Sequence, residues 1–213
     1  FLADSFLEAT GLMGVFTCVT GLGETGKFLC ESGVDKLAFT GSTATAKRVA
    51  ATCALSMTPV VLECGGKDPV IVDRDADLKK AADAAIWSAM SNAGQTCIGA
   101  ERVYVHHDVA DKFIEHCLRI ASAIKPGAPG VGNYGPATMP KQLGIIEGHI
   151  KDAIARGGKV LLGGIESVHA PYVDPVIIAD VPEDSTAITE ETFGPTLVIN
   201  RVATMEEAVA LTN

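Results

Sequence analysis

A cysteine among small residues is the first candidate for a reactive group in this sequence. Cys97 lies in the run Asn92-Ala93-Gly94-Gln95-Thr96-Cys97-Ile98-Gly99, just after an expected helix. Because little bulk surrounds it, a thiolate there can stay accessible and be stabilised by backbone N–H groups. The alternative for any single cysteine is a small, buried and inert side chain. That alternative suits the cysteines expected in or beside strands and in helices, namely Cys18, Cys30, Cys53, Cys64 and Cys117.

A carboxylate suited to general base catalysis ends an apolar strand. In Val61-Leu62-Glu63-Cys64-Gly65-Gly66-Lys67, Glu63 stands at the expected carboxyl edge of a parallel sheet, where ligands bind. We expect it to be partly buried and able to take a proton from a reacting group. The alternative is a strand-end carboxylate that is solvated or caps a turn.

Two further segments have the residue types of a ligand site. Phe39-Thr40-Gly41-Ser42-Thr43 ends a strand and begins a helix, where backbone N–H groups can bind an anion and Gly41 permits close approach. Ser42 or Thr43 is equally well explained as a helix cap. In Glu190-Glu191-Thr192-Phe193-Gly194-Pro195, an acid could accept ribose hydroxyls beside a ring that flanks a flat ligand, or the segment is a simple turn.

Short apolar runs alternate with helical stretches along the chain. The expected strands are Val15–Val19, Lys36–Thr40, Val60–Glu63, Pro69–Asp73, Arg102–His106, Val160–Leu162, Tyr172–Ile178 and Thr196–Val202. The expected helices are Glu24–Glu31, Thr43–Leu55, Asp75–Ser91 with Asp77 as its cap, Val109–Ala123, Lys141–Gly157 and Thr204–Leu211, with a Gly- and Pro-rich loop at Pro126–Gly135. This alternation predicts an α/β fold with a parallel sheet and a boundary near Gly65-Gly66.

The composition excludes several classes of function. The 213 residues are 47% hydrophobic and 20% charged, with a net charge of −9 and no basic stripe, which argues against nucleic-acid binding. No apolar run is long enough to span a membrane, and the first residues lack the basic region of a signal peptide. The six cysteines form no C-x-x-C pair or zinc spacing, so we expect no metal site and a reducing, cytoplasmic setting.

In this order, the four segments resemble the motifs of the NAD(P)-dependent aldehyde dehydrogenase superfamily along essentially the whole chain. Leu62–Gly66 is similar to Leu-Glu-Leu-Gly-Gly, Gly94–Cys97 to Gly-Gln-x-Cys, Phe39–Thr43 to Phe-Thr-Gly-Ser-Thr, and Glu191–Pro195 to Glu-x-Phe-Gly-Pro. The separation of the two candidate catalytic residues, 97 − 63 = 34, also fits. Cys64 stands where the family has Leu, and Ala46 where it often has Gly.

The resemblance implies a role for each of these residues. Cys97 would attack an aldehyde, and Glu63 would activate the water that hydrolyses the thioester. NAD or NADP would contact Gly41 and Ser42 at its pyrophosphate and Glu191, with Phe193 beside it, at its nicotinamide ribose. Gly21, in the loop that flanks the adenosine end, and Cys64 complete the implied cofactor-binding set.

The resemblance also implies a three-layer aldehyde dehydrogenase-like fold. Residues 1–65 would be the C-terminal half of a partial Rossmann-type cofactor domain, and residues 66–213 a catalytic domain incomplete at its C-terminus. The substrate would be a small aldehyde, for which a semialdehyde is one option. The parent protein would be a bacterial, cytoplasmic homo-oligomer without nucleic-acid or membrane partners.

Three alternatives stay open. Both ends look like cut helices, and the family's oxyanion-stabilising Asn would precede Phe1, so these residues could be a fragment that is inactive alone. A non-enzymatic binding or structural relative would be expected to lose Cys97 or Glu63, and both are present. A CoA-acylating enzyme would need a poor water-activating base, so Glu63 favours hydrolysis.

Overall fold

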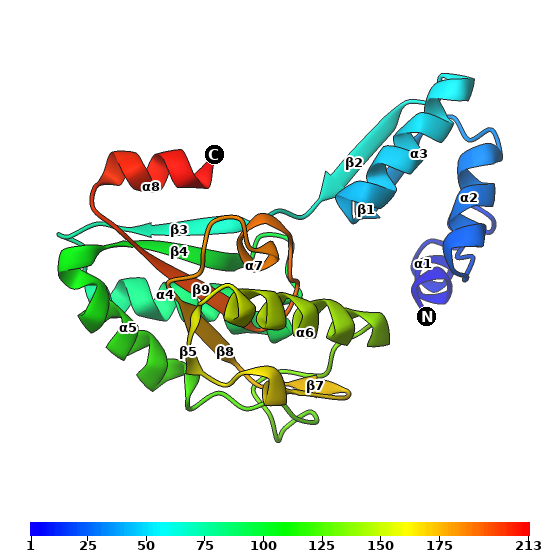
Figure 1. Cartoon of the computed structure of the whole chain (residues 1–213). Helices are drawn as coiled ribbons and strands as arrows, with labels where there is room; N and C mark the ends of the chain where they lie inside the picture. Colours follow the sequence, from blue (N-terminus) through cyan, green and yellow to red (C-terminus); the bar gives the residue numbers. More distant parts are fainter. The chain divides into compact units, whose positions relative to one another are not determined.

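The computed structural model describes all 213 residues, which form two compact units, Phe1–Cys64 and Gly65–Asn213 (Figure 1). This division falls one residue before the boundary expected after residue 65. No helix in either unit combines the length and the apolar character needed to cross a membrane.

The first unit is a small strand–helix–strand arrangement preceded by two helices. It contains α1 (Leu2–Thr10), α2 (Gly23–Glu31), β1 (Leu37–Gly41), α3 (Thr43–Ser56) and β2 (Val60–Cys64). The two strands are parallel, with Leu37 opposite Val60 and Gly41 opposite Cys64. Their core is a cluster of four buried residues: Cys30, Leu37, Val49 and Cys53. The helices and strands expected between Glu24 and Glu63 are therefore confirmed to within a residue or two.

The expected strand Val15–Val19 is wrong. These residues form an irregular, exposed segment after α1, and Gly14, just before them, has a positive φ of 78°. An apolar run becomes a strand only when another strand satisfies its backbone N–H and C=O groups. In this unit the hydrogen-bonded strands are β1 and β2 alone, and they pair with each other.

The second unit is built on a five-stranded sheet. Its order is β3 (Asp68–Val72), β4 (Ala100–His106), β9 (Thr196–Val202), β8 (Val176–Ala179) and β5 (Lys159–Leu162). The first four strands are parallel, and β5 pairs antiparallel with β8 at one edge. The expectation of a parallel sheet is thus confirmed except at this edge strand.

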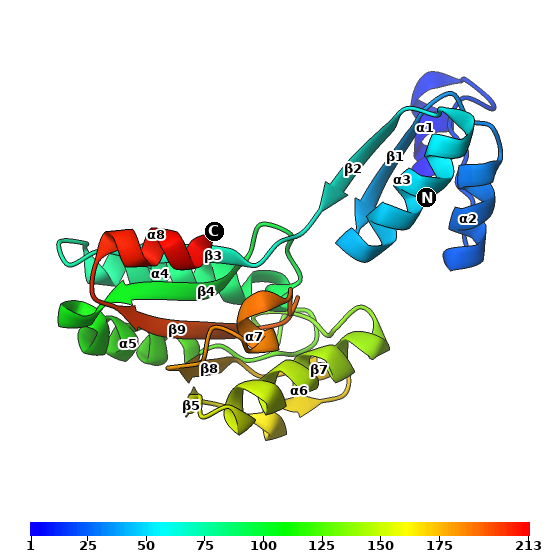
Figure 2. The same ribbon diagram turned by 45° about the horizontal axis from the view of Figure 1, so that its top comes forward.

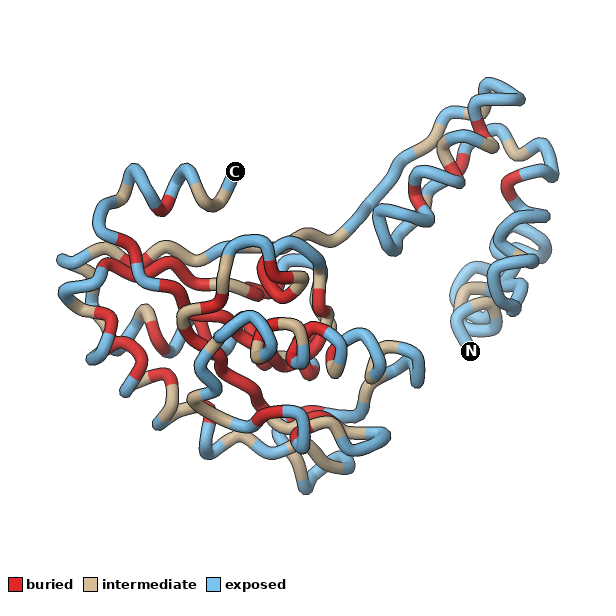
Figure 3. The backbone as a smooth tube through the Cα atoms, in the orientation of Figure 1, coloured by how far each residue is buried: buried red, intermediate tan, exposed pale blue.

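Helices cover both faces of this sheet, as Figure 2 shows. They are α4 (Leu78–Met90), α5 (His107–Ala121), α6 (Pro140–Ala155), α7 (Thr186–Thr189) and α8 (Met205–Thr212). Side chains alternate along the strands: Val103 and Val105 belong to the core with α4 and α5, whereas Tyr104 packs with Ala208 of α8. Ile178 and Val198 join the core with α6 and α7. The central strands are therefore buried on both sides (Figure 3), which gives three layers.

The expected single strand Tyr172–Ile178 is wrong, because it consists of two strands. β7 (Tyr172–Val173) pairs with β6 (Val168–His169) in a small hairpin, and β8 begins only at Val176. Pro175, which has no N–H to donate, separates them. The loop at Pro126–Gly135 and the cap at Asp77, which accepts a hydrogen bond from the Lys80 N–H, are confirmed.

The core between α4 and α5 generates a stability prediction. Phe113 on α5 is fully buried, so Phe113→Ala should lower the free energy of unfolding by about 3–5 kcal/mol. Urea unfolding can be followed by the fluorescence of Trp87, the single tryptophan, which lies on α4. The matched control is Lys112→Ala, which removes an exposed side chain one position away. Equal stability of the two variants would contradict this assignment of the core.

Candidate active site

Three segments from the sequence motifs each lead directly into a parallel strand of the second unit. Gly65–Lys67 precedes β3, Ser91–Gly99 precedes β4, and Glu190–Pro195 precedes β9. Since β3, β4 and β9 are neighbours and parallel, their amino ends lie along one edge of the sheet. The fold therefore brings these three segments together although they are far apart in the sequence.

Cys97 lies in an exposed loop with an unusual backbone. Asn92 and Ala93 have positive φ values of 52° and 58°, and Gly94 has a φ of 67°. A Cβ atom on Gly94 would lie 2.0 Å from the carbonyl oxygen of Gly194, so only glycine allows this approach. The Cys97 loop is thus in backbone contact with the turn that contains Phe193.

Gln95, a residue of the Gly-Gln-x-Cys motif, holds the Cys97 loop from the other side. Its Nε2 donates to the carbonyl oxygens of Asn92 (3.1 Å) and Pro136 (3.2 Å). Its Oε1 accepts from the Thr138 N–H at 2.8 Å. Because every polar atom of this amide is used, the loop is fixed while Cys97 itself remains exposed.

Glu191 packs directly against the first glycine of the second unit. A Cβ on Gly65 would lie 1.8 Å from Glu191 Oε1, so the Gly-Gly pair leaves room for this carboxylate. Glu191 is half-buried and receives no hydrogen bond from the protein. Burial raises its pKa, and the negative charges of Glu101 and Asp68 act in the same direction.

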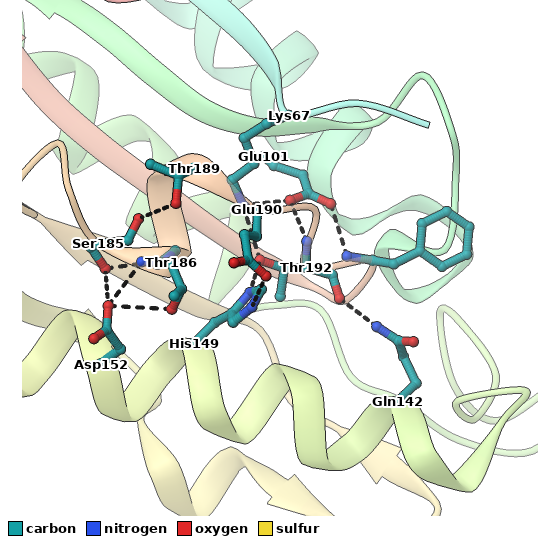
Figure 4. Close-up of polar contacts among 12 residues, drawn as sticks. Lys67, Glu101, Gln142, His149, Asp152, Ser185, Thr186, Thr189, Glu190 and Thr192 are labelled. Atoms are coloured by element: carbon teal, nitrogen blue, oxygen red, sulfur yellow. Dashed lines mark hydrogen bonds and ion pairs between the residues drawn. The ribbon is translucent and has the colours of Figure 1, made fainter. Parts of the chain in front are cut away.

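A buried ion pair lies beside this turn, as Figure 4 shows. The Lys67 ammonium contacts Glu101 Oε2, and both side chains are more than 90% buried. Lys67 also donates to Thr192 Oγ1 at 2.9 Å. The Glu101 carboxylate accepts the backbone N–H of Thr192 (2.7 Å) and that of Phe193 (2.8 Å). Burial lowers the pKa of Lys67, and the charge of Glu101 opposes that effect.

Two residues of α6 complete the hydrogen bonding of Thr192. Gln142 donates to the Thr192 carbonyl oxygen at 2.7 Å, and His149 Nδ1 lies 2.9 Å from Thr192 Oγ1. His149 Nε2 lies 4.0 Å from Glu190. The turn from Glu190 to Phe193 is therefore held by Lys67 just before β3, by Glu101 of β4 and by α6 together (Figure 4).

The short helix α7 before this turn is anchored by α6. Asp152 accepts hydrogen bonds from Ser185 Oγ (2.7 Å) and the Thr186 N–H (2.8 Å). The hydrogen bond from the Arg156 guanidinium, together with those from Ser185 and Thr186, holds the pKa of Asp152 far below its usual range. The Asp152 carboxylate therefore fixes the first residues of α7, and with them the position of Glu190, which directly follows this helix.

Sequence reasoning missed Lys67, Glu101, Gln142, His149 and Thr192 as site residues. A signal for two of them was present in the sequence. Lys67 immediately precedes one strand and Glu101 lies near the start of another. The later residues of both strands are apolar, and a charged residue is buried beside them only if it is paired. The contributions of Gln142 and His149 depend on how α6 packs, and no spacing in the sequence encodes that.

The remaining candidate residues belong to the first unit. Ser42 caps α3 by accepting from the Thr45 N–H at 3.4 Å, and Gly41 ends β1. Gly21 precedes α2 and is packed by the Thr25 side chain. Glu63 and Cys64 end β2, and both are exposed. The expectation of a partly buried Glu63 is therefore wrong, because the β2 residues from Val61 onward lack a covering layer in this unit.

The comparisons with known proteins agree on one family. A profile described as the aldehyde dehydrogenase family matches residues 1–213. Glutarate-semialdehyde dehydrogenase of Pseudomonas putida is 39% identical over 94% of this chain and 42% of its own length. D-glyceraldehyde dehydrogenase (NADP(+)) of Picrophilus torridus is 33% identical over 97% of this chain and 44% of its own. The crystal structure of an NAD-dependent aldehyde dehydrogenase from Sinorhizobium meliloti matches with a TM-score of 0.94 at 35% identity, over 100% of this chain and 43% of that one.

The fold is α/β, and an exposed cysteine lies at the amino ends of parallel strands, beside glycines that permit close contacts. The whole chain is similar in sequence and structure to aldehyde dehydrogenases. The chain belongs to the aldehyde dehydrogenase family. It spans less than half the length of the two curated relatives named above, 42% and 44%.

The buried imidazole of His149 generates a prediction about pH. Burial, and next the positive charge of Lys67, lower its pKa in the folded state, whereas an unfolded histidine titrates near about 6.5. The unfolded chain therefore binds the extra proton first, and stability present above about pH 6.5 is lost as the pH falls. His149→Gln should weaken this loss in urea unfolding measured between about pH 7.5 and 5. His116→Gln on α5 serves as the control, and identical pH profiles for wild type and His149→Gln would contradict the prediction.

Proposed function

We propose that this chain carries the catalytic segment of an enzyme that oxidises an aldehyde to a carboxylic acid with NAD+ or NADP+. One observation carries the proposal: exposed Cys97 sits on a fixed loop whose Gly94 touches the turn containing Glu191 and Phe193. A nucleophile and a ribose-binding carboxylate are thereby held at one sheet edge. By their names, the two curated relatives described above act on D-glyceraldehyde and glutarate semialdehyde, and a small polar aldehyde of this kind is the substrate that we propose.

The residues fit a dinucleotide cofactor. Glu191 lacks protein hydrogen-bond donors, so its oxygens are free to accept the hydroxyls of a nicotinamide ribose, with Phe193 beside it. The Gly41-Ser42 turn at the start of α3 would face the pyrophosphate, since backbone N–H groups there point outward and the helix dipole favours an anion. Gly21, before α2, and Cys64, at the end of β2, belong to the same proposed set. When bound, NAD(P)+ supplies the acceptor for a hydride.

The chemistry of the protein groups follows from their types. Cys97 as a thiolate attacks the aldehyde carbonyl carbon and forms a thiohemiacetal. Loss of hydride from that carbon leaves a thioester on Cys97. Glu63 then removes a proton from the water that attacks the thioester, and the thiolate leaves as the carboxylic acid forms. On this proposal the unit Phe1–Cys64 is part of the cofactor-binding domain and Gly65–Asn213 part of the catalytic domain. A cytoplasmic location and a homo-oligomeric whole protein are parts of the same proposal.

Replacement of the nucleophile tests the proposal first. In the full natural protein that contains these residues, Cys97→Ala should abolish the formation of NAD(P)H from a small aldehyde. The reaction is measured by the absorbance of NAD(P)H. The matched control is Cys18→Ala, which removes another exposed cysteine. The proposal is wrong if Cys97→Ala turns over like the wild type, or if the wild type forms no NAD(P)H with any aldehyde tried.

Replacement of the base tests the hydrolytic step. Glu63→Gln should leave one turnover of NAD(P)H formation per site and slow the steady state by about 10²–10⁴-fold, because the thioester persists. Intact-protein mass spectrometry should then detect the acyl group on Cys97. Full steady-state turnover by Glu63→Gln would rule out its role as the base. A wild type that turns over only when CoA is added would show that CoA, not water, takes the acyl group.

A further inference from the structure

We propose that Glu101 is a positioning residue that aligns Glu191 and Phe193 with the Cys97 loop, with Lys67 as its counter-charge. The inference rests on the proposed function, because it concerns how the cofactor-binding turn is held for hydride transfer. Glu101 touches neither substrate nor cofactor in this proposal. It acts through the backbone of the turn.

The carboxylate of Glu101 organises two consecutive peptide groups. Its Oε2 accepts the Thr192 N–H at 2.7 Å, and its Oε1 accepts the Phe193 N–H at 2.8 Å. These N–H groups belong to the Glu191–Thr192 and Thr192–Phe193 peptides, which follow Glu191 directly. A carboxylate offers each donor its own oxygen, and a charged acceptor makes stronger hydrogen bonds than a neutral one.

The backbone of Phe193 requires such a constraint. Its φ is 50°, in the left-handed region that non-glycine residues rarely adopt. A conformation of this kind persists only where the surroundings over-determine it, and functional turns are common places for it. The Glu101 carboxylate supplies one constraint, and the Gln142 bond to the Thr192 carbonyl oxygen supplies another.

The same residue is rigidly joined to the Cys97 loop. Glu101 follows Cys97 by four positions and lies near the start of β4. Between them, the Gly99 N–H donates to the Thr96 carbonyl oxygen (3.0 Å), and the Ala100 N–H donates to Ser88 Oγ of α4 (2.9 Å). The contact of Gly94 with Gly194 forms a second link. If the turn that contains Glu191 moves, its hydrogen bonds to Glu101 are disturbed. Glu101 belongs to β4, the strand that directly follows the Cys97 loop.

Lys67 makes the arrangement stable. Both charges are almost completely buried, and an unpaired carboxylate in such a place is strongly disfavoured. Lys67 also bonds Thr192 Oγ1, so the ammonium neutralises Glu101 and holds the same turn. β3, β4 and the turn before β9 thus share one charge pair.

The test separates hydride transfer from nucleophilic attack. Glu101→Gln keeps the size of the side chain, but its amide can accept at one oxygen only and no longer pairs with Lys67. With the full natural protein, kcat for NAD(P)H formation should fall by about 10²-fold, as expected for misplaced reacting groups. The KM for NAD(P)+ should rise, and the kinetic isotope effect with aldehyde deuterated at its carbonyl carbon should increase. Hydrolysis of p-nitrophenyl acetate without cofactor should be retained, since it needs Cys97 but no aligned nicotinamide.

Glu183→Gln is the matched control. Its carboxylate also bridges two donors, Tyr104 Oη (2.6 Å) and Asn200 Nδ2 (2.8 Å), but it does not contact the Glu191 turn. This variant should keep the wild-type isotope effect and KM. Glu101→Asp retains the charge on a shorter side chain and should show the same pattern of changes in weaker form. This variant keeps the test possible if Glu101→Gln does not fold.

The outcomes are distinct. Equal losses of NAD(P)H formation and ester hydrolysis in the Glu101 variants, with an unchanged isotope effect, would make Glu101 a purely structural residue and overturn the inference. Wild-type kinetics in Glu101→Gln would also overturn it. Failure of the proposed function itself has a different signature, because Cys97→Ala would then leave NAD(P)H formation and ester hydrolysis intact.

Discussion

The buried pair of Lys67 and Glu101 is the interaction on which the organisation of the candidate site depends. Removing two charges from water is costly, and their mutual attraction offsets that cost only when the remaining donors and acceptors are also satisfied. Here they are satisfied by the backbone of Thr192 and Phe193 and by the Thr192 hydroxyl. Because the turn supplies these partners, the stability of the buried pair and that of the turn depend on each other.

The sheet explains why these particular segments meet. Neighbouring parallel strands expose their amino ends along one edge, so any residue just before β3, β4 or β9 is brought to the same place. Apolar side chains on both faces fix the register, since a slip of one residue would exchange the two sets. Gly65 then lets the Glu191 carboxylate, and Gly94 the Gly194 backbone, approach more closely than a Cβ would permit. The apolar packing of the sheet therefore determines how closely the segments before β3, β4 and β9 approach one another.

Much of this architecture could be predicted from the sequence, for identifiable reasons. The helices around Val49 and Phe113 have apolar faces at helical spacing, and Ser42 and Asp77 are residue types that cap helices. The wrong predictions share a cause, because the spacing of apolar residues does not indicate which strand or layer they will pack against. Val15–Val19 has the composition of a strand but no neighbour to bond, and Glu63 ends its strand without a covering layer. The role of Glu101 was hidden because its partners are 34 residues upstream and 91 downstream.

The charge distribution around Glu191 shows what a ligand would contribute. This carboxylate is half-buried, lies near Glu101 and Asp68, and receives no protein hydrogen bond, so its ionised form is less stable than in water. Lys67 compensates only in part, because its ammonium is committed to Glu101 and Thr192. A ligand that presents two hydroxyl groups would supply the missing donors and lower the pKa of Glu191 as it binds. The protein therefore supplies hydrogen-bond donors to Glu101 and none to Glu191, so that on the proposed function Glu101 holds the turn and Glu191 binds the ligand.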